Sequence, residues 1–283
     1  MSPLSEDSVT IFESALLLAG CGFLIWFLFV PSGRAARARP AALAVWEISL
    51  TDLLLLGWII LIIGFLGQAL LQATVGPALG KMPEGATIER ILYGSTFHLG
   101  AMLAWFCATL LARRRHPDAA SMESPLARSS PFSVIRSGFL TFLAVMPLAT
   151  GSALAWERFL DLLGLPTERQ ELVDLFVQTK SPVLLALMIA LALVVAPIVE
   201  ELVFRAGIFR FLRSRAPRWV AFAVSGGLFA LLHGNWVSAL PLFVLGLVFA
   251  AAYERTGRLA VPMLAHALFN LNTLLLVLVG VDR

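Results

Sequence analysis

The sequence predicts an all-α, polytopic integral membrane protein built as a bundle of about eight transmembrane helices. Of the 283 residues, 59% are hydrophobic and only 14% are charged, whereas about a quarter of the residues in a soluble globular domain are charged. The apolar residues also occur in blocks of ~20 residues, which is the length that a helix needs to span the hydrocarbon core. Because lipid cannot satisfy backbone polar groups, each of these blocks must be helical.

Eight apolar blocks along the chain are the candidate membrane helices. The first block is longer than the apolar core of a signal peptide and follows two acidic residues, so we interpret it as a retained helix. Cys21 and Cys107 lie in different blocks, which is typical of small buried residues and not of a disulfide framework. The eight blocks cover residues 9–30, 49–74, 91–112, 134–156, 182–200, 218–234, 236–253 and 260–280.

Basic residues are distributed unevenly over the loops between these blocks. Fifteen of the 21 Lys and Arg residues follow odd-numbered blocks, and the other six lie on the opposite side. Because positively charged loops stay in the cytoplasm, we expect both chain termini to face outward. The segment 205–215 mixes arginines with apolar residues, so we expect an amphipathic helix on the cytoplasmic surface. The basic character of the chain is thus explained by anionic lipid and does not indicate nucleic-acid binding.

A segment rich in Ser, Pro and charged residues divides the chain. It runs from Ala112 to Arg136 and has no apolar periodicity, which is typical of a cytoplasmic linker. We therefore predict an N-terminal membrane region with four helices plus the linker over residues 1–130. A C-terminal membrane region follows over residues 131–283, and the ionisable residues within apolar blocks are concentrated there.

Two adjacent carboxylates stand out in the C-terminal region. Glu200 and Glu201 follow a long apolar run, and Arg205 lies one helical turn after Glu201, close enough to pair with it. These residues have a structural explanation as a solvated helix end and a structural ion pair. A charged side chain at the centre of a membrane helix nevertheless costs about 2.5–3.5 kcal/mol on insertion scales, which makes a functional role the default interpretation.

Two further helices carry polar side chains of the kinds that hydrolysis needs. His233 ends an apolar run, and His266 and Asn270 lie four residues apart, hence on one face of the last helix. A single His in a membrane bundle more often forms a hydrogen bond between helices. Here a carboxylate base, two imidazoles and an amide fall within about seventy residues, so we interpret them as one functional site.

Three motifs in these helices resemble one protein family. The letters EELVFR from Glu200 fit EExxxR, the letters FALLH ending at His233 fit FxxxH, and the letters HALFN from His266 fit HxxxN. In this order the motifs resemble the CPBP family, which comprises CAAX prenyl endopeptidases and bacteriocin-processing (Abi) proteases. The resemblance covers about residues 182–278, the catalytic core of the family, and leaves the helices before it unassigned.

The resemblance implies an intramembrane endopeptidase whose cavity opens toward the cytoplasm. It implies that Glu200 is the general base for a water molecule, that His233 is its partner on this water, and that His266 and Asn270 stabilise the oxyanion. The expected substrate is a membrane-anchored, lipidated or sorting-tail peptide, and the expected location is a prokaryotic plasma membrane. The remaining motif residues, in supporting roles, are Glu201, Arg205 and Phe229.

This chemistry is reasonable for these residue types. A water nucleophile needs a base, and the negative charge that develops on a peptide carbonyl needs preorganised donors, each worth about 2.7–4 kcal/mol in measured cases. An amide and a properly held imidazole can supply them. No Ser or Cys is singled out by a neighbouring base, so the sequence does not favour a covalent mechanism.

The dependence on a metal stays open. Glu200, His233 and His266 would be the ligands of a zinc ion with an open fourth position. Against zinc, the sequence lacks the H-E-x-x-H motif, Asn270 is an unusual ligand, and no carboxylate is evident as a partner for the imidazoles. We therefore favour a glutamic-type protease without a cofactor over a zinc-dependent version of the same enzyme.

Two other functional classes are compatible with parts of the pattern. A non-proteolytic scaffold or bacteriocin-immunity protein would be expected to lose Glu200 or His233, and both are present. A transporter would use Glu and His as a proton relay, but its two halves would be alike, and here they differ. The expected partners are membrane lipid and a peptide or protein substrate, prenylated or otherwise anchored in the membrane.

The depth of His233 does not fit this scheme easily. Charge topology puts Glu200 and His266 near the cytoplasmic ends of their helices. His233 follows Arg218 by 15 residues, or ~22 Å along a helix. The sequence therefore predicts that His233 lies deeper than its partners, unless tilt of the helix shortens the difference.

Overall fold

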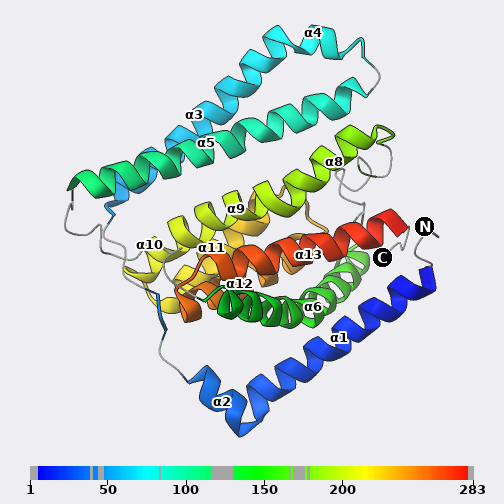
Figure 1. Cartoon of the computed structure of the whole chain (residues 1–283), viewed down its shortest axis with the longest axis vertical. Coiled ribbons are helices and arrows are strands. Elements are labelled where there is room, and N and C mark those ends of the chain that lie inside the picture. Colours follow the sequence, from blue (N-terminus) through cyan, green and yellow to red (C-terminus); the bar gives the residue numbers. More distant parts are fainter. Residues whose placement is uncertain are drawn as a thin grey trace.

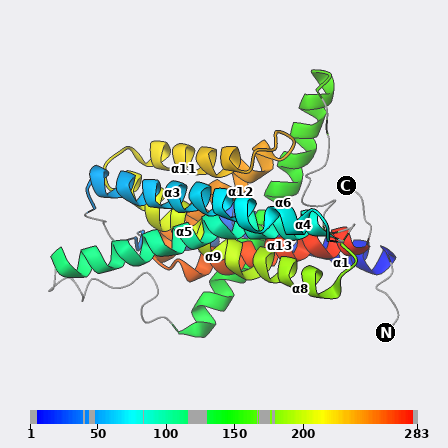
Figure 2. The same cartoon turned by 90° about the horizontal axis from the view of Figure 1, so that it is seen from above.

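The computed structural model describes residues 6–38, 41–43, 48–82, 84–115, 130–165, 167, 176 and 179–279. Within these ranges the chain forms helices and connecting turns and contains no strand. Most of the long helices run lengthwise along one bundle, whereas α6 crosses it steeply (Figures 1 and 2). The prediction of an all-α, polytopic membrane bundle is confirmed.

Seven helical stretches in the described residues are long and apolar enough to cross a membrane. One of them, residues 182–213, is a single continuous helix made of five consecutive elements: α8 (Pro182–Ala190), η2 (Leu191–Val195), α9 (Ala196–Glu201), η3 (Leu202–Phe209) and α10 (Arg210–Arg213). The others are α1 (Glu6–Phe29), α3 (Leu50–Thr74), α5 (Gly85–Arg115), α6 (Pro131–Leu162), α12 (Ala239–Thr256) and α13 (Ala260–Val279). The remaining predicted block, residues 218–234, forms α11 (Arg218–Leu232), whose 15 residues are fewer than a full crossing needs.

The helices before residue 130 do not form one packed group. Three of them, α1, α3 and α5, reach membrane length, so the prediction of four such helices in this region is wrong for the described residues. The fourth begins only at Pro131. Figure 1 shows the paired helices α3 and α5 on one side of the bundle and α1 on the other, where α1 packs against α6 and α13. The shorter connecting helices are α2 (Pro31–Arg37) and α4 (Gly76–Leu79).

The helix 182–213 contains two π-helical stretches, η2 and η3. Pro197 lies two residues after η2, where its ring would clash with the carbonyl four residues earlier in a regular α-helix. The π turns of η2 precede this proline, and the carbonyl oxygen of Ala192 within them accepts a hydrogen bond from the side chain of Asn270. Stretches of this kind occur frequently at functional sites. Glu200 and Glu201 lie between η2 and η3.

The expected amphipathic surface helix over residues 205–215 is wrong. Residues up to Arg213 continue the long helix, and Arg205, Phe209 and Arg210 are buried within the bundle. Because Arg205 and Arg210 belong to the helix interior, they do not contribute to a basic loop. The arginines that follow form an arginine-rich end of the bundle, which we define by Arg213, Arg215, Arg218, Arg255 and Arg258.

The arginine-rich end is tied together by Glu254 of α12. The Glu254 carboxylate accepts from Arg213 (Nε–Oε1, 2.5 Å) and Arg218 (Nη2–Oε2, 2.7 Å), so the turn from α10 to α11 is fixed to the end of α12. Arg255 donates to the carbonyl oxygens of Ala36 and Arg37 at the end of α2. The start of α1 and the end of α13 lie together at the opposite end of the bundle (Figure 1).

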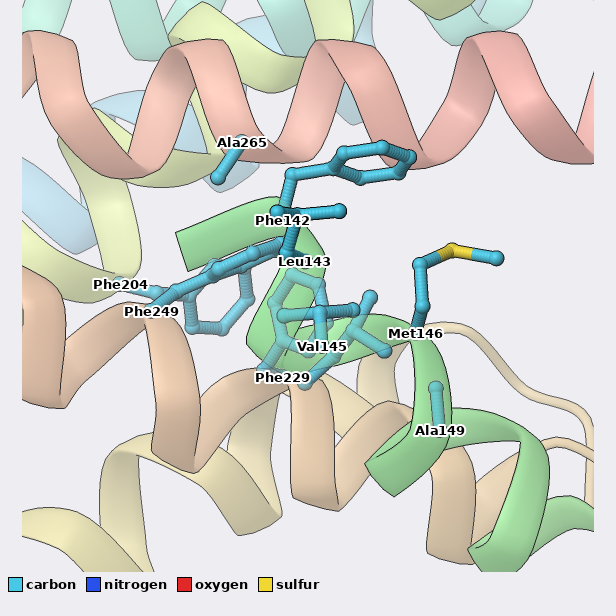
Figure 3. Packing of buried hydrophobic residues seen from close by; sticks show 10 residues of the cluster. Phe142, Leu143, Val145, Met146, Ala149, Phe204, Phe229, Phe249 and Ala265 are labelled. Carbon is cyan, nitrogen blue, oxygen red and sulfur yellow. The ribbon is translucent and has the colours of Figure 1, made fainter. Parts of the chain in front are cut away.

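The main hydrophobic core lies where α6, η3, α11, α12 and α13 converge. Figure 3 shows its side chains gathered between these helices. Helices α11 and α12 approach each other closely where Gly226 faces Gly246. A Cβ atom on Gly246 would come within 2.7 Å of the Gly226 Cα, so a larger residue would not fit there. The core residues are Phe142, Leu143, Val145, Met146, Ala149, Phe204, Phe229, Leu245, Phe249 and Ala265.

Candidate active site

Glu200, His233 and His266 meet in space although they come from three different helices. The Oε2 atom of Glu200, on α9, lies 3.9 Å from Nε2 of His233 and 3.8 Å from Nε2 of His266. His233 directly follows the last residue of α11, and His266 lies on α13. The Nε2 atoms of both imidazoles therefore face one carboxylate oxygen of Glu200.

The predicted difference in depth between His233 and Glu200 is not found. Because the helix that carries Glu200 continues to Arg213, Glu200 lies 13 residues, or ~20 Å, from the arginine-rich end. His233 lies 15 residues from Arg218 along α11, at nearly the same height. The expectation that Glu200 lies near the end of its helix was wrong, whereas the distance of His233 from Arg218 along α11 is as expected.

The ring of His233 is held by its own helix. Its Nδ1–H donates a hydrogen bond to the carbonyl oxygen of Phe229, at 2.7 Å, because a carbonyl oxygen can only accept. In the neutral imidazole Nε2 is then an acceptor, and this atom faces Glu200. The spacing of four residues in the FxxxH motif makes this contact possible.

His266 is held by a carboxylate. Its Nδ1 lies 3.1 Å from Oε1 of Glu201, and the same oxygen lies 3.0 Å from Nη1 of Arg205. Glu201 and Arg205 are fully buried, and His266 nearly so. The sequence argument that no carboxylate partners the imidazoles is therefore wrong for His266, because the helix geometry that brings the two together could not be read from the sequence.

Aromatic rings surround the buried guanidinium of Arg205. Its Cζ lies 4.3 Å from the ring centroid of Phe229 and 5.4 Å from that of Phe249, distances at which cations are attracted to aromatic faces. The Phe249 ring also stacks on His266, with centroids 5.2 Å apart and an angle of 29°. Sequence reasoning missed Phe249, because it is one of several large apolar residues in an apolar helix and carries no distinguishing signal.

Asn270 lies one helical turn after His266 but makes a different contact. Its Nδ2 donates to the carbonyl oxygen of Ala192 at 2.8 Å. Ala192 belongs to the π-helical stretch η2, so Asn270 connects α13 to the helix that carries Glu200. An amide nitrogen has two hydrogens, and this bond uses one of them.

The site has a buried side and an accessible side. The side chains of Glu200 and His233 are 23% and 29% exposed, whereas Glu201 and Arg205 are inaccessible. Among the described residues, Glu200 Oε2 makes no hydrogen bond to a protein group. The side chains of Glu200 and His233 are therefore partly accessible, although the Oε2 atom itself is buried, and the Arg205–Glu201–His266 row forms the rear of the site.

Residues 182–272 match the family described as Type II CAAX prenyl endopeptidase Rce1-like. The matched range contains all three motifs and every residue of the site. This segment is similar to that family. The resemblance predicted from the motifs is thereby confirmed for about a third of the chain.

Two curated relatives are similar to part of the chain. One is the protein named "Putative membrane peptidase YdiL" of Bacillus subtilis (strain 168), 36% identical over 84 residues, which is 30% of this chain and 34% of the relative. The other is named "Membrane-embedded CAAX protease MroQ" of Staphylococcus aureus (strain USA300), 40% identical over 83 residues, which is 27% of this chain and 34% of the relative. The chain thus spans about a third of the length of the relatives it matches. No solved structure matches it.

The side chains of the Rce1-like site do not have the spacing of a zinc site. Ligands at 2.0–2.1 Å in a tetrahedron lie ~3.3–3.4 Å from one another. The distances from Glu200 to His233 and His266 are 3.9 and 3.8 Å. In the part of the chain that the structure describes, no group of three His, Cys, Asp or Glu residues is arranged to hold a metal ion.

Proposed function

We propose that this protein is an intramembrane endopeptidase of the CAAX-protease type, which hydrolyses a peptide bond with a water molecule activated by Glu200 and His233. The observation that carries the proposal is the position of Glu200 Oε2, 3.9 and 3.8 Å from the Nε2 atoms of His233 and His266. The Rce1-like match of residues 182–272 supports the same reaction.

The water molecule is oriented by two acceptors. Groups separated by more than about 3.5 Å are commonly bridged by water, and both Glu200 Oε2 and the neutral His233 Nε2 accept hydrogen bonds. A water that donates one hydrogen to each directs its lone pair away from both, toward a substrate carbonyl. Glu200 takes one proton as this water attacks, and then delivers it to the departing amine.

His266 and Asn270 stabilise the oxyanion that results. With a proton on both ring nitrogens, His266 donates from Nδ1 to Glu201, at 3.1 Å, and from Nε2 to the oxyanion. Asn270 keeps one amide hydrogen beyond the bond to Ala192. Both donors are held before the substrate arrives, which is the condition under which such donors lower a barrier most effectively.

The substrate that we propose is a peptide anchored in the membrane, either lipidated or carrying a sorting tail. The site lies within the membrane bundle, about halfway along the helix 182–213, so a soluble peptide would reach it poorly. The name of the relative MroQ as a CAAX protease supports a CAAX-like substrate. A pair of quenched peptides of identical sequence, one farnesylated and one not, tests this choice, and equal cleavage of both would contradict it.

The protein carries out this reaction without a metal ion, in contrast to the zinc-dependent alternative. The test compares purified wild type with Glu200→Gln on the farnesylated peptide, with and without a strong chelator. Cleavage is expected to be lost in Glu200→Gln and unaffected by the chelator. Loss on chelation that zinc restores would contradict the metal-free mechanism, and an active Glu200→Gln would contradict the role of the carboxylate.

The location that we propose is a prokaryotic plasma membrane, with both termini on the outer side. The arginine-rich end holds five arginines outside the bundle interior, and positive loops remain in the cytoplasm. A reporter fused after residue 283 that is active only outside the cytoplasm tests this topology.

A further inference from the structure

His98 is a partly buried, ionisable residue near the middle of α5, outside the segment that matches the Rce1-like family. Its Nδ1–H donates to the carbonyl oxygen of Gly94 at 2.9 Å, because a carbonyl oxygen can only accept. In the neutral imidazole Nε2 is then an acceptor, and in the part of the chain that the structure describes no group donates to this atom. An ionisable residue within a membrane helix is costly, so a functional role is the default interpretation.

The face of α5 that carries His98 is turned toward the long helix of the two glutamates. Ile91 and Trp105 lie seven residues before and after His98, and positions seven apart differ by only about 20° around an α-helix. Ile91 packs against the buried cluster that contains Met188, and Trp105 packs against the cluster that contains Ala206. His98 lies on the same face between these two contacts.

His98 and Glu200 lie at a similar height in the bundle. The helix α5 and the helix 182–213 run side by side in the same direction (Figure 1). His98 is midway between the two contacts on α5, and the midpoint of these contacts on the other helix is Pro197. Pro197 is three residues, or ~4.5 Å along the axis, from Glu200. Cα atoms of α5 and α9 approach within 8 Å, so little lateral distance separates the two helices here.

An apolar cavity begins beside both residues. It lies between α3, α5 and η3, and its volume of about 320 Å³ falls within the range of about 300–1,000 Å³ that is typical of ligand pockets. Ala101 lines the cavity one turn after His98, and Leu202 and Val203 line it directly after the two glutamates. His98 and Glu200 therefore lie at the same end of a space that no described side chain fills.

A peptide that enters this site brings backbone N–H groups into surroundings poor in water, where each group without an acceptor costs free energy. In the proposed mechanism, Glu200 and His233 accept from the attacking water. Glu201 is engaged with Arg205 and His266. The Nε2 atom of His98 is an acceptor that none of these contacts uses.

We propose that His98 is a substrate-binding residue, whose Nε2 accepts a hydrogen bond from a backbone N–H of the peptide that Glu200 cleaves. The peptide lies extended along the end of the cavity, between the imidazole of His98 on one side and Glu200 on the other. The inference rests on the proposed function for the nature of the ligand. The hydrogen bond itself concerns binding and is measurable without turnover.

Peptides in which one amide is replaced by an ester test this hydrogen bond, because an ester lacks the N–H and keeps the shape of the chain. The replacement is made in turn at every bond of the fluorescent farnesylated peptide except the scissile one. Binding to Glu200→Gln is measured for each peptide. At one position the ester should weaken binding about 2- to 12-fold, the factor that one net hydrogen bond contributes. When His98→Leu is added, the amide peptide should bind equally weakly, and the ester at this position should cause no further loss.

Two further variants separate this role from a structural one. His98→Gln keeps an acceptor and should again bind the amide more tightly than the ester. Thr96→Val is the matched control, because it removes a polar group from the face of α5 that bonds to the carbonyl of Gly64 on α3. It should leave the effect of every ester unchanged.

The inference is overturned if no ester position weakens binding to Glu200→Gln, or if every ester has the same effect with and without His98. A protein that does not bind the amide peptide at all also overturns it. Cleavage by wild type is measured separately. An inactive wild type whose peptide binding depends on His98 at one ester position contradicts the proposed function and leaves the role of His98 in binding supported.

Discussion

Arg205, Glu201 and His266 form a row of charged and polar side chains at the rear of the site. Two of the three are completely buried, and burial of a charge is costly unless a partner compensates it. The carboxylate of Glu201 contacts both neighbours, at 3.0 and 3.1 Å. The negative charge of Glu201 therefore compensates the buried charge of Arg205, and the same carboxylate orients His266.

Removal of Arg205 alone should destabilise the protein strongly. Arg205→Met leaves Glu201 buried with His266 as its remaining partner, and loss of one member of a buried pair costs about 3–5 kcal/mol. Unfolding in mixed micelles measures this loss. The double variant Arg205→Met with Glu201→Gln should recover part of the stability, because no buried charge is left unpaired. Equal stability of the single and double variants would contradict this account.

Phe249 should affect catalysis through the position of His266. Phe249→Leu removes the ring that stacks on His266 at 5.2 Å, so kcat should fall while KM changes little. Phe142→Leu is the matched control, because Phe142 belongs to the same core and has no ring contact with His266 among the described residues. Similar kinetic effects of both variants would indicate that Phe249 acts only through packing.

Asn270 is expected to contribute through its amide hydrogens. Asn270→Asp keeps the size of the side chain but removes its donors, so it should lower kcat/KM by roughly the 10²–10³-fold that loss of one oxyanion donor causes. Asn272→Asp provides a control on the same helix, two residues further, where the asparagine is buried whereas Asn270 is partly buried. If both variants lose activity equally, the amide of Asn270 has no special role.

At the scale of elements, the helix 182–213 is the part of the fold that positions the carboxylates. Its two π-helical stretches bracket Glu200 and Glu201, and Asn270 satisfies the carbonyl of Ala192 within the first. One extra residue in a helical turn rotates every later side chain relative to the earlier ones. The direction of Glu200 thus depends on the helix type before it.

Pro197→Ala should test this dependence. Proline in the interior of a helix costs about 3 kcal/mol relative to alanine, so thermal stability should not fall and can rise. Activity should fall, because the turn before Glu200 is then free to adopt regular α-helical geometry. Pro147→Ala in the interior of α6 is the control, for which activity should be retained. Full activity of Pro197→Ala would contradict the positioning role of the π turns.

At the scale of the whole molecule, Glu254 connects the helices of the arginine-rich end. Glu254→Gln should lower stability by about 1.5–3 kcal/mol, the range for hydrogen bonds to charged groups, and the value should lie at the low end because Arg213 and Arg218 are partly exposed. Glu157→Gln, at an exposed position of α6, should change little. Unfolding at low and high salt measures the stability of both variants. An unchanged stability of Glu254→Gln would contradict the role of Glu254 in connecting these helices.

The family and the class of fold follow from the sequence because both depend on local patterns. Apolar blocks must become helices in lipid wherever they pack. The motifs around Glu200, His233 and His266 contain pairs of residues four apart, which an α-helix places on one face. The pairing of Glu201 with Arg205 follows from the same periodicity, and the structure gives it at 3.0 Å.

Only the tertiary structure decided how these faces meet. The sequence could not reveal that the helix of Glu200 continues to Arg213, that Glu201 contacts His266, or that Phe249 stacks on it. These features depend on helix ends, tilt and contacts between residues far apart in the chain. Charge counting failed at Arg205 and Arg210 for the same reason: a buried arginine and a loop arginine are identical in sequence, and only packing distinguishes them.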